Sequence, residues 1–116
     1  MKLIKEVEII EKKSKFIGYL YEIDNVSEAE DILKKLKEEH KKARHIPYAY
    51  VLQNTAKKSD DKEPNGSAGM PIFSILNYNK LNSNLIAIVR YFGGTKLGIG
   101  LLTRTYMNCA KKLIDD

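Results

Sequence analysis

The sequence contains little cysteine and no long apolar run. Cys109 is its single cysteine, so no internal disulfide can form, and this favours a reducing, cytosolic setting. No apolar run approaches the roughly 18 residues that a membrane-spanning helix needs. Charges also interrupt the apolar part of the N-terminal stretch MKLIKEVEII, which is unlike a secretory signal. We therefore expect a cytoplasmic protein without membrane contact.

Charge of one sign does not dominate the chain. Its 116 residues include 20 Lys and Arg against 15 Asp and Glu, a formal net charge of +5. This charge allows contact with phosphate-rich partners, although it is below that of a dedicated nucleic-acid arm. A solubilising surface is the alternative explanation. The hydrophobic fraction of 43% and the charged fraction of 30% are typical of one globular domain.

Residue patterns predict four strands and three helices. Segments 4–10 and 15–23 predict a hairpin, and 48–53 alternates like a third strand. Segment 85–92 is a near-continuous apolar run, which is typical of a central strand covered on both faces. Further helices are predicted from Pro71 onward and over 101–114. The order β-β-α-β-loop-α-β-α predicts an α+β fold with helices packed on a sheet.

The clearest helix signal begins at Ser27. Ser27 and Glu30 match the S-x-x-E capping box. Because Pro47 makes the residue before it extended, we expect the helix to end near 43–45. We also expect His40 to hydrogen-bond a backbone group. The predicted apolar stripe is Ala29, Ile32, Leu33, Leu36 and His40.

Residues 54–69 have no periodicity, and such a long loop in a compact domain is usually functional or mobile. Asp60, Asp61 and Glu63 could bind Mg²⁺ or Ca²⁺, but their spacing does not match the calcium-loop pattern, so we expect no metal and no other cofactor. Gly66 and Gly69 permit positive φ, and the small residues between them allow close approach of another backbone. We predict an ordered loop whose carboxylates and glycines orient a basic site or contact a partner.

Residues 90–104, RYFGGTKLGIGLLTR, pass from a strand through glycines into a helix. Free N–H groups at a helix N-terminus bind anions, whereas GGTKLGIG matches neither the dinucleotide fingerprint nor the Walker motif. Glycines that only allow tight strand-to-helix packing are the alternative explanation. The predicted binding residues of this segment are Arg90, Gly93, Gly94, Lys96, Gly98, Gly100 and Arg104.

Neither the histidines nor the cysteine predicts a catalytic centre. His40 and His45 are five residues apart, which is not one helix face, and no cysteine is near, so zinc is not expected. Cys109 falls among the core positions of the last helix and is predicted to be a small buried side chain, not a nucleophile.

Four segments occur in the order of a known family: SKFIGYL, the pattern H-x-x-A-x-H-x-x-x-A-Y over 40–50, SDDKEPNGSAGMPI and VRYFGGTKLGIGLLTRTY. They resemble the YigZ/IMPACT family, formerly an uncharacterised protein family, over nearly the whole chain. The resemblance implies a fold similar to the second domain of ribosomal protein S5, which we expect as a mixed β-sheet with helices packed on one face. Bacterial members usually add a ferredoxin-like domain, so it further implies that 1–116 is the first domain alone.

Three functions remain open at this stage. The first is a translation-linked module that binds RNA, DNA, the ribosome or a translation factor. The second is an interaction with a translation-regulatory protein through the acidic loop. The third, an enzyme acting on a phosphorylated small molecule, is less favoured because no catalytic residue is identified.

Overall fold

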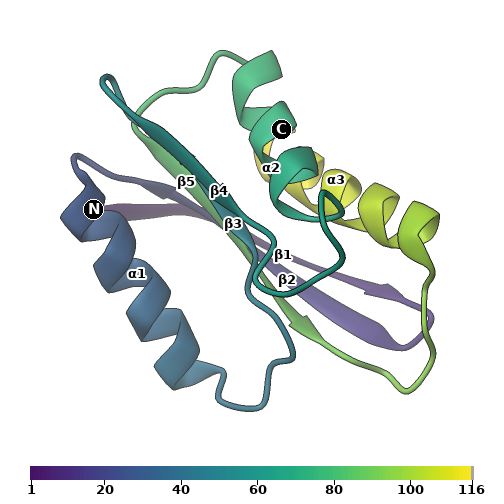
Figure 1. Cartoon of the computed structure of the whole chain (residues 1–116). Coiled ribbons are helices and arrows are strands. Elements are labelled where there is room, and N and C mark those ends of the chain that lie inside the picture. Colours follow the sequence, from purple (N-terminus) through teal and green to yellow (C-terminus); the bar gives the residue numbers. More distant parts are fainter. Residues whose placement is uncertain (116) are drawn as a thin grey trace.

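The computed structural model describes residues 1–115, in which a five-stranded sheet lies between two helical layers (Figure 1). Helix α1 covers one face of the sheet, and α2 and α3 cover the other. No helix within this described range is long and apolar enough to cross a membrane. The strands are β1 (Lys2–Glu11), β2 (Ser14–Glu22), β3 (Tyr48–Val51), β4 (Ala56–Ser59) and β5 (Asn84–Tyr91), and the helices are α1 (Val26–Glu39), α2 (Gly69–Tyr78) and α3 (Ile99–Ile114).

The strands pair in the order β1-β2-β5-β3-β4, and every neighbouring pair is antiparallel. This confirms the hairpin β1–β2 and the central position of β5. The expected mixed sheet is wrong, and β4 is the reason. A crossover from β3 through α2 would have made the next strand parallel to β3. Instead β4 first turns the chain back, so that β5 runs antiparallel to β3.

The expectation of helices on one face is also wrong, because the sheet is apolar on both faces. In β5, Leu85, Ala87 and Val89 pack toward α1, whereas Ile86 and Ile88 pack toward α2 and α3. Successive side chains of a strand point to opposite faces, so a continuous apolar run needs two covering layers. The same alternation places Arg90 on the face of Ile86 and Ile88, which α3 covers.

Strand β4 lies inside the segment that was predicted to be an unpatterned loop. Its residues Ala56, Lys57 and Lys58 are exposed, so this edge strand has no apolar face and no alternation that a sequence could reveal. Pairing with β3, from Tyr48 opposite Ser59 to Val51 opposite Ala56, forms the strand in spite of its composition.

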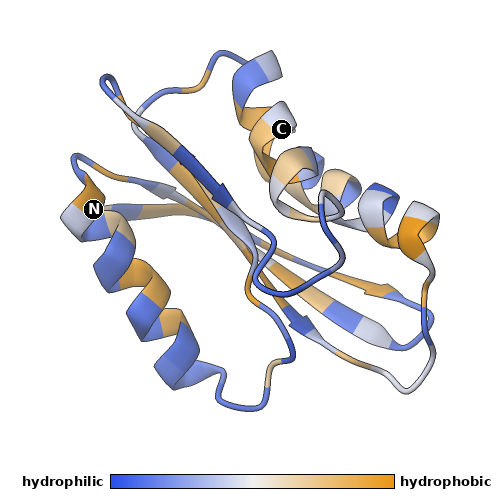
Figure 2. Ribbon diagram, viewed as in Figure 1, coloured by the Kyte–Doolittle hydropathy of each residue, from blue (hydrophilic) through white to orange (hydrophobic). Residues whose placement is uncertain are grey.

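Helix α1 begins two residues earlier than predicted and ends earlier as well. Asn25, not Ser27, is the N-cap: its side chain accepts a hydrogen bond from the Glu28 backbone at 2.9 Å, and Glu28 reaches back to the backbone N–H of Asp24. The helix ends at Glu39 and not near 43–45. Figure 2 shows the apolar stripe of α1 facing the sheet and a hydrophilic outer side.

His40 lies just after α1 and does not bond a backbone group through its ring, contrary to the expectation. Its two nitrogens contact tyrosine hydroxyls, Nε2 to Tyr19 at 3.0 Å and Nδ1 to Tyr91 at 2.6 Å. Burial, together with the charges of Glu6 and Glu39, raises the pKa of Tyr19 to about 12. This cluster ties the end of α1 to β2 and β5.

One end of the sheet brings together segments that are far apart in the sequence. Gly93 lies against the β1–β2 turn, where an added Cβ would be 2.1 Å from the carbonyl carbon of Lys13, so only glycine fits. The backbone N–H of Arg44 donates to the carbonyl of Arg90 at 2.8 Å and fixes the loop that follows α1. This end of the sheet carries the candidate site.

Candidate functional site

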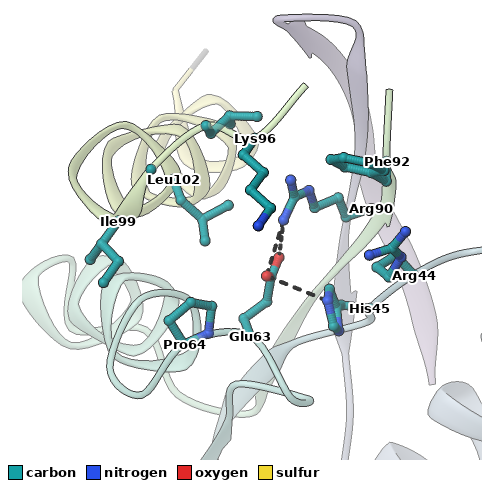
Figure 3. A pocket seen from close by; sticks show the side chains of 11 residues that line it. Arg44, His45, Glu63, Pro64, Arg90, Phe92, Lys96, Ile99 and Leu102 are labelled. Atoms are coloured by element: carbon teal, nitrogen blue, oxygen red, sulfur yellow. Dashed lines mark hydrogen bonds and ion pairs between the residues drawn. The ribbon is translucent and has the colours of Figure 1, made fainter. Parts of the chain in front are cut away.

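A pocket of about 330 Å³ lies where the loop after α1, the acidic loop 60–68 and the turn 92–98 between β5 and α3 meet (Figure 3). One side of it, the cationic wall, consists of Arg44, His45, Arg90 and Lys96. The apolar lining residues, the apolar wall, are Pro64, Leu97, Ile99 and Leu102, of which Figure 3 shows Pro64, Ile99 and Leu102 across from Arg44, His45 and Arg90. Glu63, Phe92 and Gly98 complete the lining.

The floor of the pocket is a buried ion pair between Arg90 and Glu63. Nitrogen Nη1 of Arg90 donates to the two carboxylate oxygens of Glu63 at 3.0 and 2.8 Å, and the two side chains are only 7% and 3% exposed. The Tyr106 hydroxyl of α3 donates to the same carboxylate. Burial, followed by the charge of Glu63, raises the pKa of Tyr106 well above its ordinary value of 10. The acidic loop is therefore bonded to β5 and to α3.

The guanidinium of Arg90 is held between the rings of Phe16 and Phe92, at 5.5 and 5.8 Å from the ring centroids. Its Nη2 is 3.5 Å from the Ser14 hydroxyl. Its Nε is buried and has no hydrogen-bond acceptor among the described residues. Arg90 thus has donor capacity that the protein around it does not use.

His45 is oriented by the acidic loop. Its Nδ1 is 2.7 Å from the carbonyl oxygen of Asp61, so Nδ1 donates and carries a proton. Its Nε2 then faces Glu63 Oε1 at 3.5 Å (Figure 3). The imidazole forms an ion pair with Glu63 only when it is protonated. When the imidazole is protonated, Nε2 becomes a second N–H donor and His45 adds a positive charge to the cationic wall.

The other two carboxylates of the acidic loop hold the loop itself together. Asp60 accepts hydrogen bonds from the backbone N–H groups of Gly66, Ala68 and Gly69 at 2.9, 3.1 and 2.7 Å. Burial alone would raise the pKa of Asp60, but these three donors, with Lys58, bring it below the ordinary value. The Asp61 carboxylate accepts from the backbone N–H of Ile46 at 2.6 Å. The prediction of an ordered loop packed on the body is confirmed.

The turn into α3 has no such partners for its polar groups. Gly98 is the N-cap at φ 79°, and neither a side-chain cap nor an acidic residue satisfies the first turn of the helix. Lys96 is exposed, and Figure 3 shows its ammonium directed toward the Arg90–Glu63 pair. Arg44 is exposed and stacks over the Phe92 ring, 4.6 Å from its centroid. Within residues 1–115 neither Lys96 nor Arg44 forms a salt bridge.

The charges around the pocket favour an anion. Arg44, Arg90 and Lys96 contribute three positive charges and Glu63 one negative charge, which leaves +2 before His45 is counted. The N–H groups at the start of α3 add partial positive charge. Within the described residues no group of three or more His, Cys, Asp or Glu side chains could hold a metal ion. The arrangement is suited to binding a phosphate or carboxylate.

The structure brings only some of the predicted residues to the pocket. Glu63, Arg90, Lys96 and Gly98 line it. The remaining predicted residues do not line it, namely Asp60, Asp61, Gly66, Gly69, Gly93, Gly94, Gly100 and Arg104. Of these, the two aspartates, Gly66 and Gly69 bond within or beside the acidic loop, and Gly93 packs on the β1–β2 turn.

Sequence reasoning missed Arg44, His45, Phe92 and Tyr106. His45 stands in the quoted H-x-x-A-x-H pattern, which was tested only for zinc, and Arg44 is its direct neighbour. Tyr106 looked like one more core position of the last helix. Cys109 is fully buried, as predicted, and burial raises the pKa of its thiol to about 12, with Lys112 opposing.

The fold and the pocket define an α+β domain with a basic pocket at one end of an antiparallel sheet. Residues 12–114 match the model of the Impact N-terminal domain, and the chain belongs to this family. It is 39% identical over 104 residues to the IMPACT family member YvyE of Bacillus subtilis, which covers 87% of this chain and 48% of YvyE. It is 36% identical over 100 residues to YigZ of Escherichia coli, covering 82% of this chain and 49% of YigZ.

Two solved structures share the fold. A crystal structure of a hypothetical protein superimposes with a TM-score of 0.90 at 32% identity, over 94% of this chain and 55% of that one. The two-domain translational regulator Yih1 superimposes with a TM-score of 0.54 at 17% identity, over 97% of this chain and 45% of that one. The chain spans about half the length of the curated relatives YvyE and YigZ. The similarity to ribosomal protein S5 stays a prediction.

Proposed function

We propose that this chain is a translation-linked binding module that holds a phosphate-bearing segment of RNA at the pocket. One observation carries the proposal: Arg44, Lys96 and the uncapped N-terminus of α3 meet at one mouth. Neither side chain has a carboxylate partner among the described residues. Arginine, lysine and helix N-termini are the groups that bind nucleic-acid phosphates.

The basic surface extends beyond the pocket. Lys12 and Lys13 are exposed in the β1–β2 turn, which lies against Gly93, and Lys41 and Lys42 are exposed in the loop that precedes Arg44. Both segments lie near the end of β5. The β1–β2 turn contacts Gly93, and the loop after α1 is joined to β5 by the backbone hydrogen bond from Arg44 to Arg90. A strand of RNA that enters the pocket would therefore pass further cations on either side.

The link to translation rests on relatives. Yih1, whose fold is similar, is described as a translational regulator. We extend that role to this domain, with RNA of the translation apparatus as the partner. Three cations of the pocket converge on one small volume, which suits a compact phosphate group of RNA.

The experiment is a fluorescence-anisotropy titration with a short labelled single-stranded RNA at several salt concentrations. We expect log K to fall linearly with log salt. The variant Lys96→Ala should bind every sequence more weakly to the same degree, and its salt slope should be smaller by about 0.7, the value for one lost contact with single-stranded nucleic acid. Lys111→Ala, an exposed lysine in the last turn of α3, is the matched control and should behave like the wild type.

The absence of any RNA affinity at low salt would overturn the proposal. If the chain then captured a translation protein from purified components, and this capture needed Asp60, Asp61 and Glu63, the protein-interaction hypothesis would replace it. Cosedimentation with purified ribosomes, lost in Lys96→Ala and kept in Lys111→Ala, would support the link to translation.

A further inference from the structure

The two walls of the pocket have opposite chemistry. Across the pocket of about 330 Å³, Arg44, His45 and Arg90 lie opposite Pro64, Ile99 and Leu102, and the half-buried Phe92 ring lies on the side of Arg44 and Arg90 (Figure 3). A phosphate alone would have no use for the apolar wall, and an apolar ligand would leave the cations unpaired. The lining fits a ligand with an anionic head and an apolar or planar body.

The charge of the site selects the kind of phosphate. The excess of +2 at the pocket matches a phosphomonoester, which carries about −1.5 to −2 at pH 7. An internal phosphodiester of RNA carries a single negative charge and would leave the site under-neutralised. The N–H groups at the start of α3, which have no side-chain cap, supply further donors for the extra oxygens of a terminal phosphate.

Arg90 provides an independent indication of a ligand. Its side chain is 7% exposed and lines the pocket, and its Nε has no acceptor among the described residues. Buried polar groups in folded proteins are nearly always hydrogen-bonded. Glu63 engages only Nη1, and Nη2 has only the Ser14 hydroxyl as a partner at 3.5 Å, so the guanidinium retains donor capacity for an additional anion.

The size of the pocket limits the length of the ligand. A volume of about 330 Å³ is near the lower end of the roughly 300–1,000 Å³ of small-molecule sites. One nucleotide fills such a space, whereas a run of stacked bases does not.

We propose that the pocket binds a nucleotide through a terminal phosphomonoester, either as a free nucleoside monophosphate or as the 5′-phosphorylated end of an RNA. The phosphate lies at the start of α3 between Lys96, Arg44 and Arg90, and the nucleoside lies along Ile99 and Leu102. This inference deepens the proposed function. Binding of an RNA 5′ end rests on the proposed function, whereas binding of a free nucleotide does not.

The first experiment is isothermal titration calorimetry of the chain with adenosine 5′-monophosphate, adenosine and inorganic phosphate at low salt. The monophosphate should bind at least about tenfold more tightly than adenosine, because charge-assisted hydrogen bonds are lost with the phosphate. It should also exceed inorganic phosphate, because only the nucleotide uses the apolar wall. Lys96→Ala should weaken the binding of both the monophosphate and inorganic phosphate. Ile99→Asn should weaken only the binding of the monophosphate, and Lys111→Ala should change neither affinity.

The second experiment compares two RNAs of one sequence, with a 5′-phosphate and with a 5′-hydroxyl. Preference for the phosphorylated RNA supports an RNA end as the source, and binding of the free monophosphate alone supports the small molecule. Equal binding of both RNAs together with no binding of the monophosphate overturns the inference and leaves the proposed function intact. Equal affinity for inorganic phosphate and the monophosphate also overturns it. Binding of the monophosphate without any RNA affinity sustains the inference while the proposed function fails.

Discussion

The acidic loop 60–68 and the basic turn 92–98 are the two most distinctive segments of the chain, and the structure uses their charges in opposite ways. In the acidic loop every carboxylate has partners: Asp60 has three backbone donors, Asp61 has one, and Glu63 has Arg90 and Tyr106. In the basic turn, Lys96 has no salt-bridge partner within residues 1–115, and the first turn of α3 has no side-chain cap.

The difference separates charges that build the site from charges that are available to a ligand. Removal of a carboxylate that has buried partners is destabilising because those partners lose their acceptor, whereas an exposed ammonium contributes little to stability and can be used in binding. Both segments look equally functional in the sequence. Mutations in the two segments should therefore have different effects. Loss of a carboxylate from the acidic loop should lower the stability of the protein, and loss of a cation from the basic turn should lower its affinity for a ligand.

The largest effect is expected for Glu63→Gln. This change keeps the shape of the side chain but leaves the charge of the buried Arg90 without its counter-charge. Removal of one partner from a buried ion pair costs about 3–5 kcal/mol. The free energy of unfolding, measured by urea denaturation with circular dichroism, should fall by this amount. Glu38→Gln, at an exposed position of α1, should stay within about 0.5 kcal/mol of the wild type.

A second variant tests the reason for that loss. If the uncompensated charge is responsible, Arg90→Met combined with Glu63→Leu should recover most of the stability, because apolar replacement of a whole buried pair is often neutral. A Glu63→Gln protein that is as stable as the Glu38→Gln control would show that the acidic loop is not anchored through this carboxylate.

Most of the fold could be predicted from the sequence because its periodicity is strong. The hairpin β1–β2, the central strand β5 and the last helix follow from their apolar patterns taken together with segment length and β-branched or aromatic content. Strand β4 could not be predicted, since its exposed residues carry no alternation and its pairing with β3 alone forms it. Without β4, the order β3-α2-β5 would imply a parallel β3–β5 pair, as in a mixed sheet, whereas the pair is antiparallel. The N-cap at Asn25 was missed because Ser27 and Glu30 also match a helix-capping motif.

The candidate site was only partly predictable, for a different reason. Charged residues are visible in a sequence, but whether a partner neutralises them depends on contacts between distant segments. Nothing local distinguishes Asp60, which the loop's own N–H groups surround, from Glu63, which is bonded across the core to Arg90. Arg44 and His45 became part of the site because two backbone hydrogen bonds with Arg90 fix their loop beside β5.

A smaller loss of stability is expected for Asp60→Ala. The change removes the acceptor of three backbone N–H groups, and hydrogen bonds to charged groups are each worth about 1.5–3 kcal/mol. Because loop relaxation and water can satisfy part of this set, we expect a total of about 2 kcal/mol at neutral pH. Asp31→Ala, an exposed aspartate of α1, is the matched control.

The same variant has a defined pH dependence. The pKa of Asp60 is lowered in the folded protein below its ordinary value of 3.8, so its contribution is fully present above that value and is lost as the pH falls through the folded pKa. The difference in unfolding free energy between wild type and Asp60→Ala should therefore be constant near neutrality and shrink in strong acid. A difference that grew on acidification would contradict the assigned hydrogen bonds.

The smallest effect on stability is expected for Lys96→Ala. A small effect here, beside a large one for Glu63→Gln, would distinguish the basic turn from the acidic loop. Lys96 is exposed and forms no salt bridge with any described residue, so the free energy of unfolding should change by less than about 0.5 kcal/mol. The substitution lowers the charge of the pocket from +2 to +1 and so reduces the electrostatic repulsion of Arg44 and Arg90. Urea denaturation of this variant beside Glu63→Gln measures both segments on one scale. A loss above about 1 kcal/mol for Lys96→Ala would mean that the basic turn, like the acidic loop, uses its charge to hold the fold, and the binding site would then have to be sought elsewhere on the surface.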